Sequence, residues 1–425
     1  MTEIPTIFVL EPTAEESQRR AAGTLIRKES RPDLESLKTH LREIRQYSRD
    51  HQAALLEQLN ESLKRHPRLR LVSCPDARQA AAYIRQIAGK INLVSVNKSS
   101  VVINELRPEL QASGFKIYVR YFTEFKDFDK KVQDYWDLPG LHQRGLVESF
   151  DVSVKLTQLE SAETRDYLAV LGVNAISAED GSIFFLQHLS NISKDLQQAK
   201  KVVLVITPEK VVADKEAALF QTRCMGIFGL ESILLDLGPK ELGQYDFEAL
   251  PIVPEDREVH VLILDNGRGT LLVDGYRQLL LCLDCRACAR QCPIGLHVDH
   301  QGWVWSPKNY LFGFLQGWVS STEACLHCGR CEVECPVEIA LPDLIWEAQF
   351  EHYARHGRPW RKRLLDNPEL LAKFGSLLAP LSNWVKDTPI FKLLMEALVG
   401  LHRKARLPVF HRQTLRKWAR EGHRG

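Results

Sequence analysis

Between positions 69 and 264, hydrophobic residues fall into short, almost continuous runs. The runs occupy residues 69–74, 91–96, 116–121, 202–206 and 259–264. An unbroken apolar run of this length is typical of a strand that is buried on both faces. Segments 77–87, 101–111 and 210–221 lie between the runs and have a helical composition. This alternation predicts a largely parallel sheet covered by helices, in an α/β domain of about 200 residues.

A different pattern surrounds the turn sequence Glu179-Asp180-Gly181. Apolar segments 173–177 and 183–187 flank this polar, glycine-containing stretch. The combination predicts two strands joined by a hairpin. Glu179 could present a carboxylate to a ligand at the end of a strand, where α/β proteins bind ligands. A plain hairpin turn is the simpler interpretation of the same residues.

The two ends of the chain have helical periodicity. Before residue 65, leucine and isoleucine recur at mostly three- and four-residue steps, which predicts an amphipathic arm packed on the body. These positions are Leu34, Leu37, Leu41, Ile44, Leu55, Leu56, Leu59 and Leu63. The last 75 residues are expected to be helical, with breaks at Pro359, Pro368, Pro380 and Pro389. We therefore expect an N-terminal helical arm at 1–65, an α/β domain at 66–270, a mainly helical cysteine-rich domain at 271–350 and a basic helical tail at 351–425.

Charge is unevenly distributed along the 425 residues. The net charge is only +2, but residues 351–425 contain 16 Lys and Arg against 6 Asp and Glu. Such a tail could bind an anionic membrane surface or an acidic protein, or it could be a solvated surface. Nucleic acid is not expected as a partner, because no aromatic-interleaved binding motif accompanies the charge.

The sequence shows neither a membrane-spanning segment nor a secretory signal, and this bears on the expected compartment. No apolar run is long enough to cross a bilayer, and the opening MTEIPTIFVLEP has no basic segment followed by an apolar core. We expect a cytoplasmic protein that could also lie peripherally at a membrane. Dense cysteines in a reducing compartment indicate metal binding rather than disulfides.

Two cysteine runs carry the most specific chemistry. Each has the spacing Cys-x2-Cys-x2-Cys-x3-Cys-Pro, beginning at Cys282 and at Cys325. This is the bacterial-ferredoxin spacing for [4Fe–4S] clusters, in which the fourth Cys of each run ligates the other cluster. We therefore predict two [4Fe–4S] clusters, held crosswise. The predicted ligands are Cys282, Cys285, Cys288 and Cys335 for one cluster, and Cys325, Cys328, Cys331 and Cys292 for the other.

The main alternative for these runs is a pair of zinc sites. Zinc sites usually consist of two Cys pairs separated by a longer spacer, whereas each run here places four Cys within eleven residues. The spacing favours iron–sulfur clusters. Cys74 and Cys224 lie outside both runs, and we expect them to be small buried side chains of the core.

Two further segments could bind an anion or another ligand. Lys98, Ser99 and Ser100 lie between a predicted strand and a predicted helix, where free N–H groups and the helix dipole attract anions. A serine that merely caps the helix is the simpler explanation. Arg268 follows a turn sequence, Asp265-Asn266-Gly267, and could pair with an acidic ligand or a main-chain carbonyl.

These features together resemble the lactate-utilisation protein B family (LutB-like), which joins a LUD domain to a two-cluster ferredoxin-type segment. The residues that carry the resemblance are Asn97-Lys98-Ser99-Ser100 and the segments 172–182, 203–212, 262–268 and 302–307. The family implies a LUD fold similar to CoA transferases and sugar isomerases. Asp180 is a departure, because it stands where the family usually has Thr.

The resemblance implies one subunit of a three-part cytoplasmic complex that oxidises L-lactate to pyruvate. The other subunits would be a cysteine-rich protein with CCG motifs and a lone LUD-domain protein. This chain has no CCG pair and no G-x-G-x-x-G fingerprint after a strand. We therefore expect a non-catalytic electron-transfer subunit of an oxidoreductase acting on L-lactate or a similar 2-hydroxy acid. Two alternatives remain open, namely a subunit of a heterodisulfide-reductase-like complex and a scaffold whose clusters are structural.

Overall fold

The computed structural model divides the chain into two compact units, Met1–Ala348 and Gln349–Gly425. The structure describes residues 4–10, 32–118, 166–187, 191–229, 248–250, 257–290, 292–297, 303–413 and 415–420. The division of the chain into four parts at 65, 270 and 350 stays a prediction.

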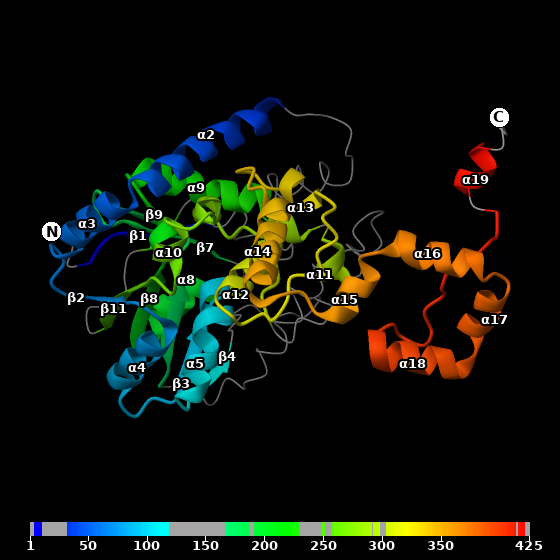
Figure 1. Cartoon of the computed structure of the whole chain (residues 1–425). Helices are drawn as coiled ribbons and strands as arrows, with labels where there is room; N and C mark the ends of the chain where they lie inside the picture. The colour runs from blue at the N-terminus through cyan, green and yellow to red at the C-terminus, as the bar shows by residue number, and fades with distance from the viewer. Residues whose placement is uncertain are drawn as a thin grey trace, which may run out of the picture. The chain divides into compact units, whose positions relative to one another are not determined.

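A six-stranded, wholly parallel sheet forms the centre of the first unit (Figure 1). Its strands, in spatial order, are β2 (Leu69–Cys74), β11 (Glu258–Leu264), β8 (Lys201–Ile206), β5 (Leu168–Gly172), β3 (Leu93–Val96) and β4 (Lys116–Tyr118). The predicted α/β class with a parallel sheet is therefore confirmed. The last three residues of predicted strand 116–121 lie outside the described residues.

Alternate residues of the central strands pack into two different cores, which explains their continuous apolar sequence. Val202, Leu204 and Ile206 of β8 join one core, together with the leucines of α3 (Gln52–Leu63). Val203 and Val205 join the other core, on the opposite face. That second face is covered by α4 (Ala77–Ala88), the π-helix η1 (Val101–Leu106) and α5 (Arg107–Ala112).

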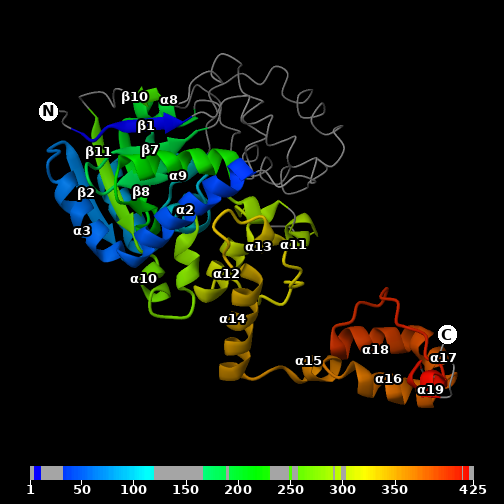
Figure 2. The same ribbon diagram turned by 90° about the horizontal axis from the view of Figure 1, so that it is seen from above.

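A second, smaller sheet lies on the α3 side (Figure 2). Its order is β10 (Glu248–Leu250), β1 (Ile7–Leu10), β7 (Ile183–Leu186), β6 (Ala175–Ser177) and β9 (Val211–Val212). Strands β6 and β7 are antiparallel, so the predicted hairpin is present. Glu179 and Asp180 are exposed in its turn.

The N-terminal arm is not helical throughout, which corrects the prediction for residues 1–65. Ile7–Leu10 forms strand β1, parallel to β7 and antiparallel to β10. Its partners lie more than 170 residues away in the sequence, and no local signal announces such pairing. The predicted leucine pattern corresponds to α2 (Pro32–Asp50) and α3.

One helix boundary also differs from prediction. The helix expected at 210–221 is α9 (Lys215–Phe228), because Pro208–Lys210 forms a 3₁₀ turn and β9 follows it. Asp214 caps α9, accepting a hydrogen bond from the N–H of Ala217 at 2.8 Å. Before Cys282 the chain forms two short helices, α10 (Arg268–Leu271) and the 3₁₀ helix η5 (Arg277–Leu281).

The cysteine segment of the first unit consists of short helices and curved loops. Its helices are η6 (Ala287–Ala289), α11 (Pro293–His297), α12 (Pro307–Leu315), α13 (Arg330–Val333) and α14 (Leu341–His356). Pro293 is the first residue of α11, a position where the N–H that proline lacks is not needed for the helix. This segment shares a core with Leu41 of α2 and Met225 of α9, two helices that lie side by side (Figure 2).

All the regular secondary structure described in the second unit is helical. It contains the end of α14 and α15 (Trp360–Leu365), α16 (Pro368–Leu377), α17 (Leu381–Asp387), α18 (Pro389–Val399) and α19 (Leu415–Arg420). A helix begins at or directly after each predicted proline break, since a proline fits the first turn of a helix. None of the helices in the described ranges combines the length and apolar character needed to cross a bilayer.

Candidate functional site

The eight cysteines of the two runs fall into two electrostatically linked sets. In the first thiol set (Cys282, Cys285, Cys288 and Cys335), neighbouring thiolates raise one another's pKa. In the second thiol set (Cys292, Cys325, Cys328 and Cys331), neighbouring thiolates raise the pKa of Cys292, Cys325 and Cys331, and Cys331 also acts on Cys288 of the first set. Each set combines three cysteines of one run with the fourth of the other. Ligation of iron by either set remains a prediction, and among the described residues no group of three or more His, Cys, Asp or Glu is arranged around a single metal ion.

The loops between these cysteines curl so that main-chain N–H groups face sulfur. Asp284, Arg286 and His327 all have positive φ, at 66°, 61° and 50°. A left-handed conformation is uncommon for residues other than glycine. It lets the N–H of Asp284 donate to the Sγ of Cys282 at 3.2 Å. The N–H of Ile339 donates to the Sγ of Cys335 at 3.5 Å in the same manner.

Burial strongly disfavours free thiolates at these positions. Burial raises the pKa of Cys285 to about 12, and the N–H of Ala287 offsets only part of that effect. Burial and the neighbouring thiolates raise the pKa of Cys331 to about 12 and that of Cys335 to about 11. A buried thiolate becomes favourable when a metal cation compensates its charge. The curled loops, the donated N–H groups and the grouped thiols therefore fit an iron–sulfur cluster in each set.

Buried cations lie around the first thiol set. The ammonium of Lys210 donates to the carbonyl of Leu283, next to Cys282. Burial alone would lower the pKa of Lys308, but the charges of Cys282 and Asp284 raise it overall. Arg45 of α2 donates to the carbonyls of Leu281 and Leu280 at 3.1 and 2.7 Å, although burial lowers its pKa to about 10. The backbone leading into Cys282 is thus held by positive side chains.

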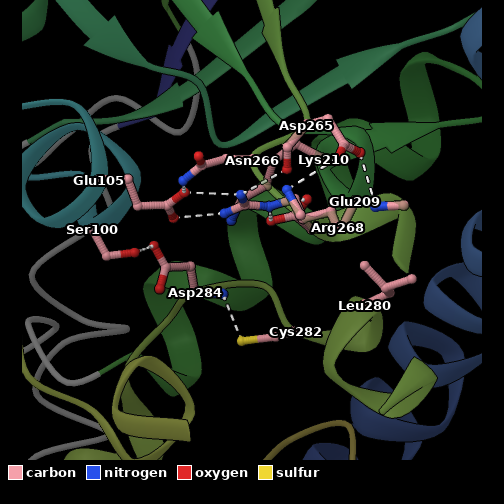
Figure 3. A network of polar contacts seen from close by, with 12 residues as sticks. Ser100, Glu105, Glu209, Lys210, Asp265, Asn266, Arg268, Leu280, Cys282 and Asp284 are labelled. Atoms are coloured by element: carbon pink, nitrogen blue, oxygen red, sulfur yellow. Dashed lines mark hydrogen bonds and ion pairs between the residues drawn. The ribbon is translucent and has the colours of Figure 1, made fainter. Parts of the chain in front are cut away.

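Arg268 is the centre of a buried ionic network beside this loop (Figure 3). Its guanidinium donates to both carboxylate oxygens of Glu105, at 2.7 and 2.9 Å, and to Glu209 at 2.9 Å. Arg268 is only 1% exposed. Burial raises the pKa of Glu209, but Arg268, Lys308 and Lys210 more than offset it, and the pKa falls to about 2. The charge of Arg268 is therefore committed to two side chains of the protein.

Asn97 and its neighbours join strand ends to the cysteine loop. The side chain of Asn97 exchanges two hydrogen bonds of 2.8 Å with the main chain of Gly172. Ser99 lies close to Gly172. A Cβ atom added to Gly172 would be only 2.2 Å from the Oγ of Ser99. Ser100 is buried and makes no side-chain cap, but its hydroxyl donates to Asp284.

The chain was compared with known proteins. Lactate utilization protein B of Bacillus thuringiensis (strain Al Hakam) is 25% identical over 380 residues, which cover 80% of this chain and 78% of that protein. Its counterpart in Bacillus cytotoxicus is 24% identical over 381 residues, with the same coverage. Over four fifths of its length, the chain is similar to proteins of the LutB-like family. No family model matches the sequence, and no solved structure matches it either.

In this LutB-like chain the predicted ligand residues do not form one site. Ser100 donates to Asp284, whose N–H donates to Cys282, whereas Arg268 is paired with Glu105 in the ionic network shown in the same view (Figure 3). Glu179 lies in the exposed β6–β7 turn, where its carbonyl accepts a hydrogen bond from Ser62 at 2.8 Å. Ser99 packs against Gly172, and Glu179 lies in a separate turn. The candidate site therefore consists of the two thiol sets and the charged residues around them.

Sequence reasoning missed the charged residues of that site. Glu105, Glu209, Lys210 and Lys308 are all at most 6% exposed, yet residues of these types usually lie at the surface. Their position in the sequence was a usable signal, because Glu209 and Lys210 lie in the short turn that follows β8 at the carboxyl edge of the parallel sheet. That edge is where α/β proteins place functional groups.

A cleft of about 520 Å³ opens near the same edge. Asp76, Glu105 and Glu109 contribute carboxylates to its lining, Arg78 contributes a cation, and Trp303 and Trp318 contribute aromatic rings. Glu105 is already paired with Arg268. The lining is therefore more acidic than basic, and it does not complement the carboxylate of a hydroxy acid.

Proposed function

We propose that this LutB-like chain is the iron–sulfur electron-transfer subunit of a complex that oxidises L-lactate or a similar 2-hydroxy acid. The observation that carries the proposal is the crosswise grouping of eight thiols. Each set would hold one [4Fe–4S] cluster, which supplies reversible one-electron chemistry when bound. The assignment to lactate rests on the names of the relatives.

The chain's own residues provide what such a pair of cofactors requires. No cysteine of the first thiol set is exposed, and Cys288 and Cys335 are buried. In the second thiol set Cys328 is exposed, and Leu326 beside it is 68% exposed. An apolar, accessible edge suits a docking redox partner, since electron-transfer interfaces are small and transient. We infer that electrons enter or leave the chain at this edge.

The buried cations contribute to the redox balance of the first thiol set. Lys210 and Lys308 place positive charge beside Cys282. Positive charge stabilises the more negative, reduced state of a neighbouring redox group, and it does so more strongly in a buried, low-dielectric site. These lysines would therefore raise the reduction potential of a cluster held by the first thiol set. That cluster would be the better electron acceptor of the two.

Oxidation of the hydroxy acid is assigned to another subunit. The cleft at the sheet edge carries more carboxylates than cations, which disfavours a lactate anion there. By family resemblance, the partners would be a CCG-motif cysteine-rich subunit and a lone LUD-domain subunit. This chain would connect the oxidising site to an electron acceptor.

Metal analysis of the anaerobically purified protein tests the cofactor assignment. We expect about eight iron atoms and eight acid-labile sulfides per chain, as two [4Fe–4S] clusters require. Cys285→Ser and Cys328→Ser should each lose about half of both. Cys74→Ser is the matched control, because Cys74 is a buried cysteine of the α/β core, and its iron content should not change. Zinc in place of iron, or unchanged iron in both ligand variants, would contradict the proposal.

Redox titration and reconstitution test the role of the chain. Reversible one-electron reduction by an artificial donor supports a relay, whereas clusters that cannot be reduced reversibly would indicate a scaffold. Together with its two partner subunits, the protein should support L-lactate-dependent reduction of an artificial acceptor. Reduction that depends on thiols instead of lactate would indicate a heterodisulfide-reductase-like complex and refute the lactate assignment.

A further inference from the structure

We propose that the C-terminal unit, Gln349–Gly425, docks on an anionic membrane surface through two exposed apolar helix stripes. The first stripe runs along α16 and continues one residue past its end. Its members are Leu370, Leu371, Phe374, Leu377 and Leu378, and all of them are exposed. Their spacing of i, i+1, i+4, i+7 and i+8 places them on one face of a helix. In a globular protein such an apolar helix face normally packs against the core, yet Leu377 is 74% exposed.

The second stripe has the same character. Ile390, Leu393, Leu394 and Leu398 follow the spacing i, i+3, i+4 and i+8 along α18, and Ile390 is 74% exposed. Helix α17 connects α16 to α18 (Figure 1). No residue of α16 or α18 is buried. Contiguous exposed apolar surface on this scale marks an interaction site.

The charge of the unit identifies the occupant. Residues 349–425 contain 16 Lys and Arg against 6 Asp and Glu. Cations accompany the stripes on neighbouring segments, including the exposed Arg361 and Arg363 of α15 and Arg403 after α18. Each Lys or Arg near an anionic lipid surface contributes about fivefold in affinity. Leucine-rich faces combined with basic residues are typical of helices that lie in a membrane interface.

The dimensions and the aromatic residues also favour a lipid surface. Helices α16 and α18 have 10 and 11 residues, half of what a membrane-spanning helix needs, so they would lie in the plane of the interface. Trp384 of α17 is 69% exposed, and Trp360 of α15 is exposed as well. Tryptophan is enriched at the level of lipid headgroups, because its ring is apolar and its N–H is polar.

Vesicle binding of the full-length protein tests the proposal without reference to its redox state. The probes are phosphatidylcholine vesicles with and without phosphatidylglycerol, assayed by co-sedimentation at physiological salt. We expect binding to the anionic vesicles only, and weaker binding as salt increases. Because this readout needs neither lactate nor electron transfer, its failure is distinguishable from failure of the proposed function.

Two variants separate the apolar and the electrostatic contributions. Leu371→Glu with Leu394→Glu places a carboxylate in each stripe and should weaken vesicle binding at least about tenfold. The matched control is Val273→Glu on the first unit, since Val273 is 88% exposed, and it should bind like the unaltered protein. Arg361→Glu with Arg363→Glu should remove much of the preference for anionic vesicles and leaves the stripes intact.

The outcomes decide the proposal in either direction. Loss of binding in the two-leucine variant, with unchanged helix content by circular dichroism, supports it. Absence of vesicle binding by the unaltered protein would overturn it, as would equal binding by the two-leucine variant. If that variant unfolds, the arginine variant decides, because an unchanged preference for anionic vesicles would also refute the proposal.

Discussion

Removal of the guanidinium at position 268 should destabilise the first unit by about 4 kcal/mol. Arg268 pairs with two buried carboxylates, those of Glu105 and Glu209, at 2.7–2.9 Å. Arg268→Met keeps the apolar part of the side chain but leaves both carboxylates without their main partner. Breaking a buried ion pair by removing one member costs about 3–5 kcal/mol.

The loss should stay within that range rather than double it, because each carboxylate keeps some compensation. The side chain of Asn266 still donates to Glu105 at 2.7 Å, and Lys210 and Lys308 still act on Glu209. Loss of the contact between Arg268 and the Phe312 ring, at 4.8 Å, adds a smaller cost. For a unit that spans Met1–Ala348, the unfolding entropy is about 0.7 kcal/mol/K, and 4 kcal/mol corresponds to a fall of roughly 5–6 °C in melting temperature.

The assay is thermal unfolding under anaerobic conditions, followed by far-UV circular dichroism at a fixed scan rate. Unfolding that releases a cofactor is irreversible, so only variants scanned identically can be compared. Arg277→Met is the matched control, because Arg277 pairs with Asp50 at 3.0 Å while 56% exposed, and such pairs contribute little. If Arg268→Met melts no lower than Arg277→Met, the reasoning about the buried network is refuted.

Three further predictions follow from the same region. Lys308→Met should lower the reduction potential of a cluster held by the first thiol set by roughly 40–130 mV in an EPR-monitored titration, because one buried charge is worth roughly 1–3 kcal/mol and 1.4 kcal/mol equals about 59 mV for one electron. Lys308→Arg should leave this potential nearly unchanged, and equal shifts in the two variants would contradict the charge argument. Gly172→Ala should destabilise the first unit by about 1–3 kcal/mol, since the new Cβ would lie 2.2 Å from the Oγ of Ser99. If that contact is the cause, adding Ser99→Gly to this variant should restore much of the melting temperature. The pKa of Glu209 is lowered from 4.5 to about 2, so its ionised form stabilises the fold above pH 4.5, and this stabilisation is lost as the pH falls toward 2. In Glu209→Gln, the melting temperature should therefore change less between pH 4.5 and pH 2 than in the unaltered protein. An unchanged dependence of melting temperature on pH would argue against the role of this carboxylate.

Continuous apolar strands were the most predictable part of the fold. Strand β2 was placed at its observed bounds and β8 within one residue, because strands covered on both faces have little polar sequence to obscure them. Strand β5 was missed, although all five of its residues are buried. Its place between β3 and β8 is set by pairings far apart in sequence.

The site was predictable only where its chemistry is local. Cysteine spacing within eleven residues is visible in the sequence, and so is the expected exchange of the fourth Cys between runs. The burial of Glu105, Lys210 and Lys308 is not visible, because it depends on three separate segments meeting at the sheet edge. For Arg268 the turn before it was recognisable, but its carboxylate partners are 59 and 163 residues away.

The shared core of the cysteine segment has a consequence for how this protein can be taken apart. Cys288, Cys331 and Cys335 pack in one hydrophobic cluster with Leu41 and Met225, which belong to helices outside that segment. A fragment cut at the predicted boundaries would expose this apolar surface to water and lose the side chains that enclose its sulfurs. The cysteine segment is therefore not expected to fold as an independent domain. Exchanging it for a free-standing ferredoxin would require redesign of α2 and α9.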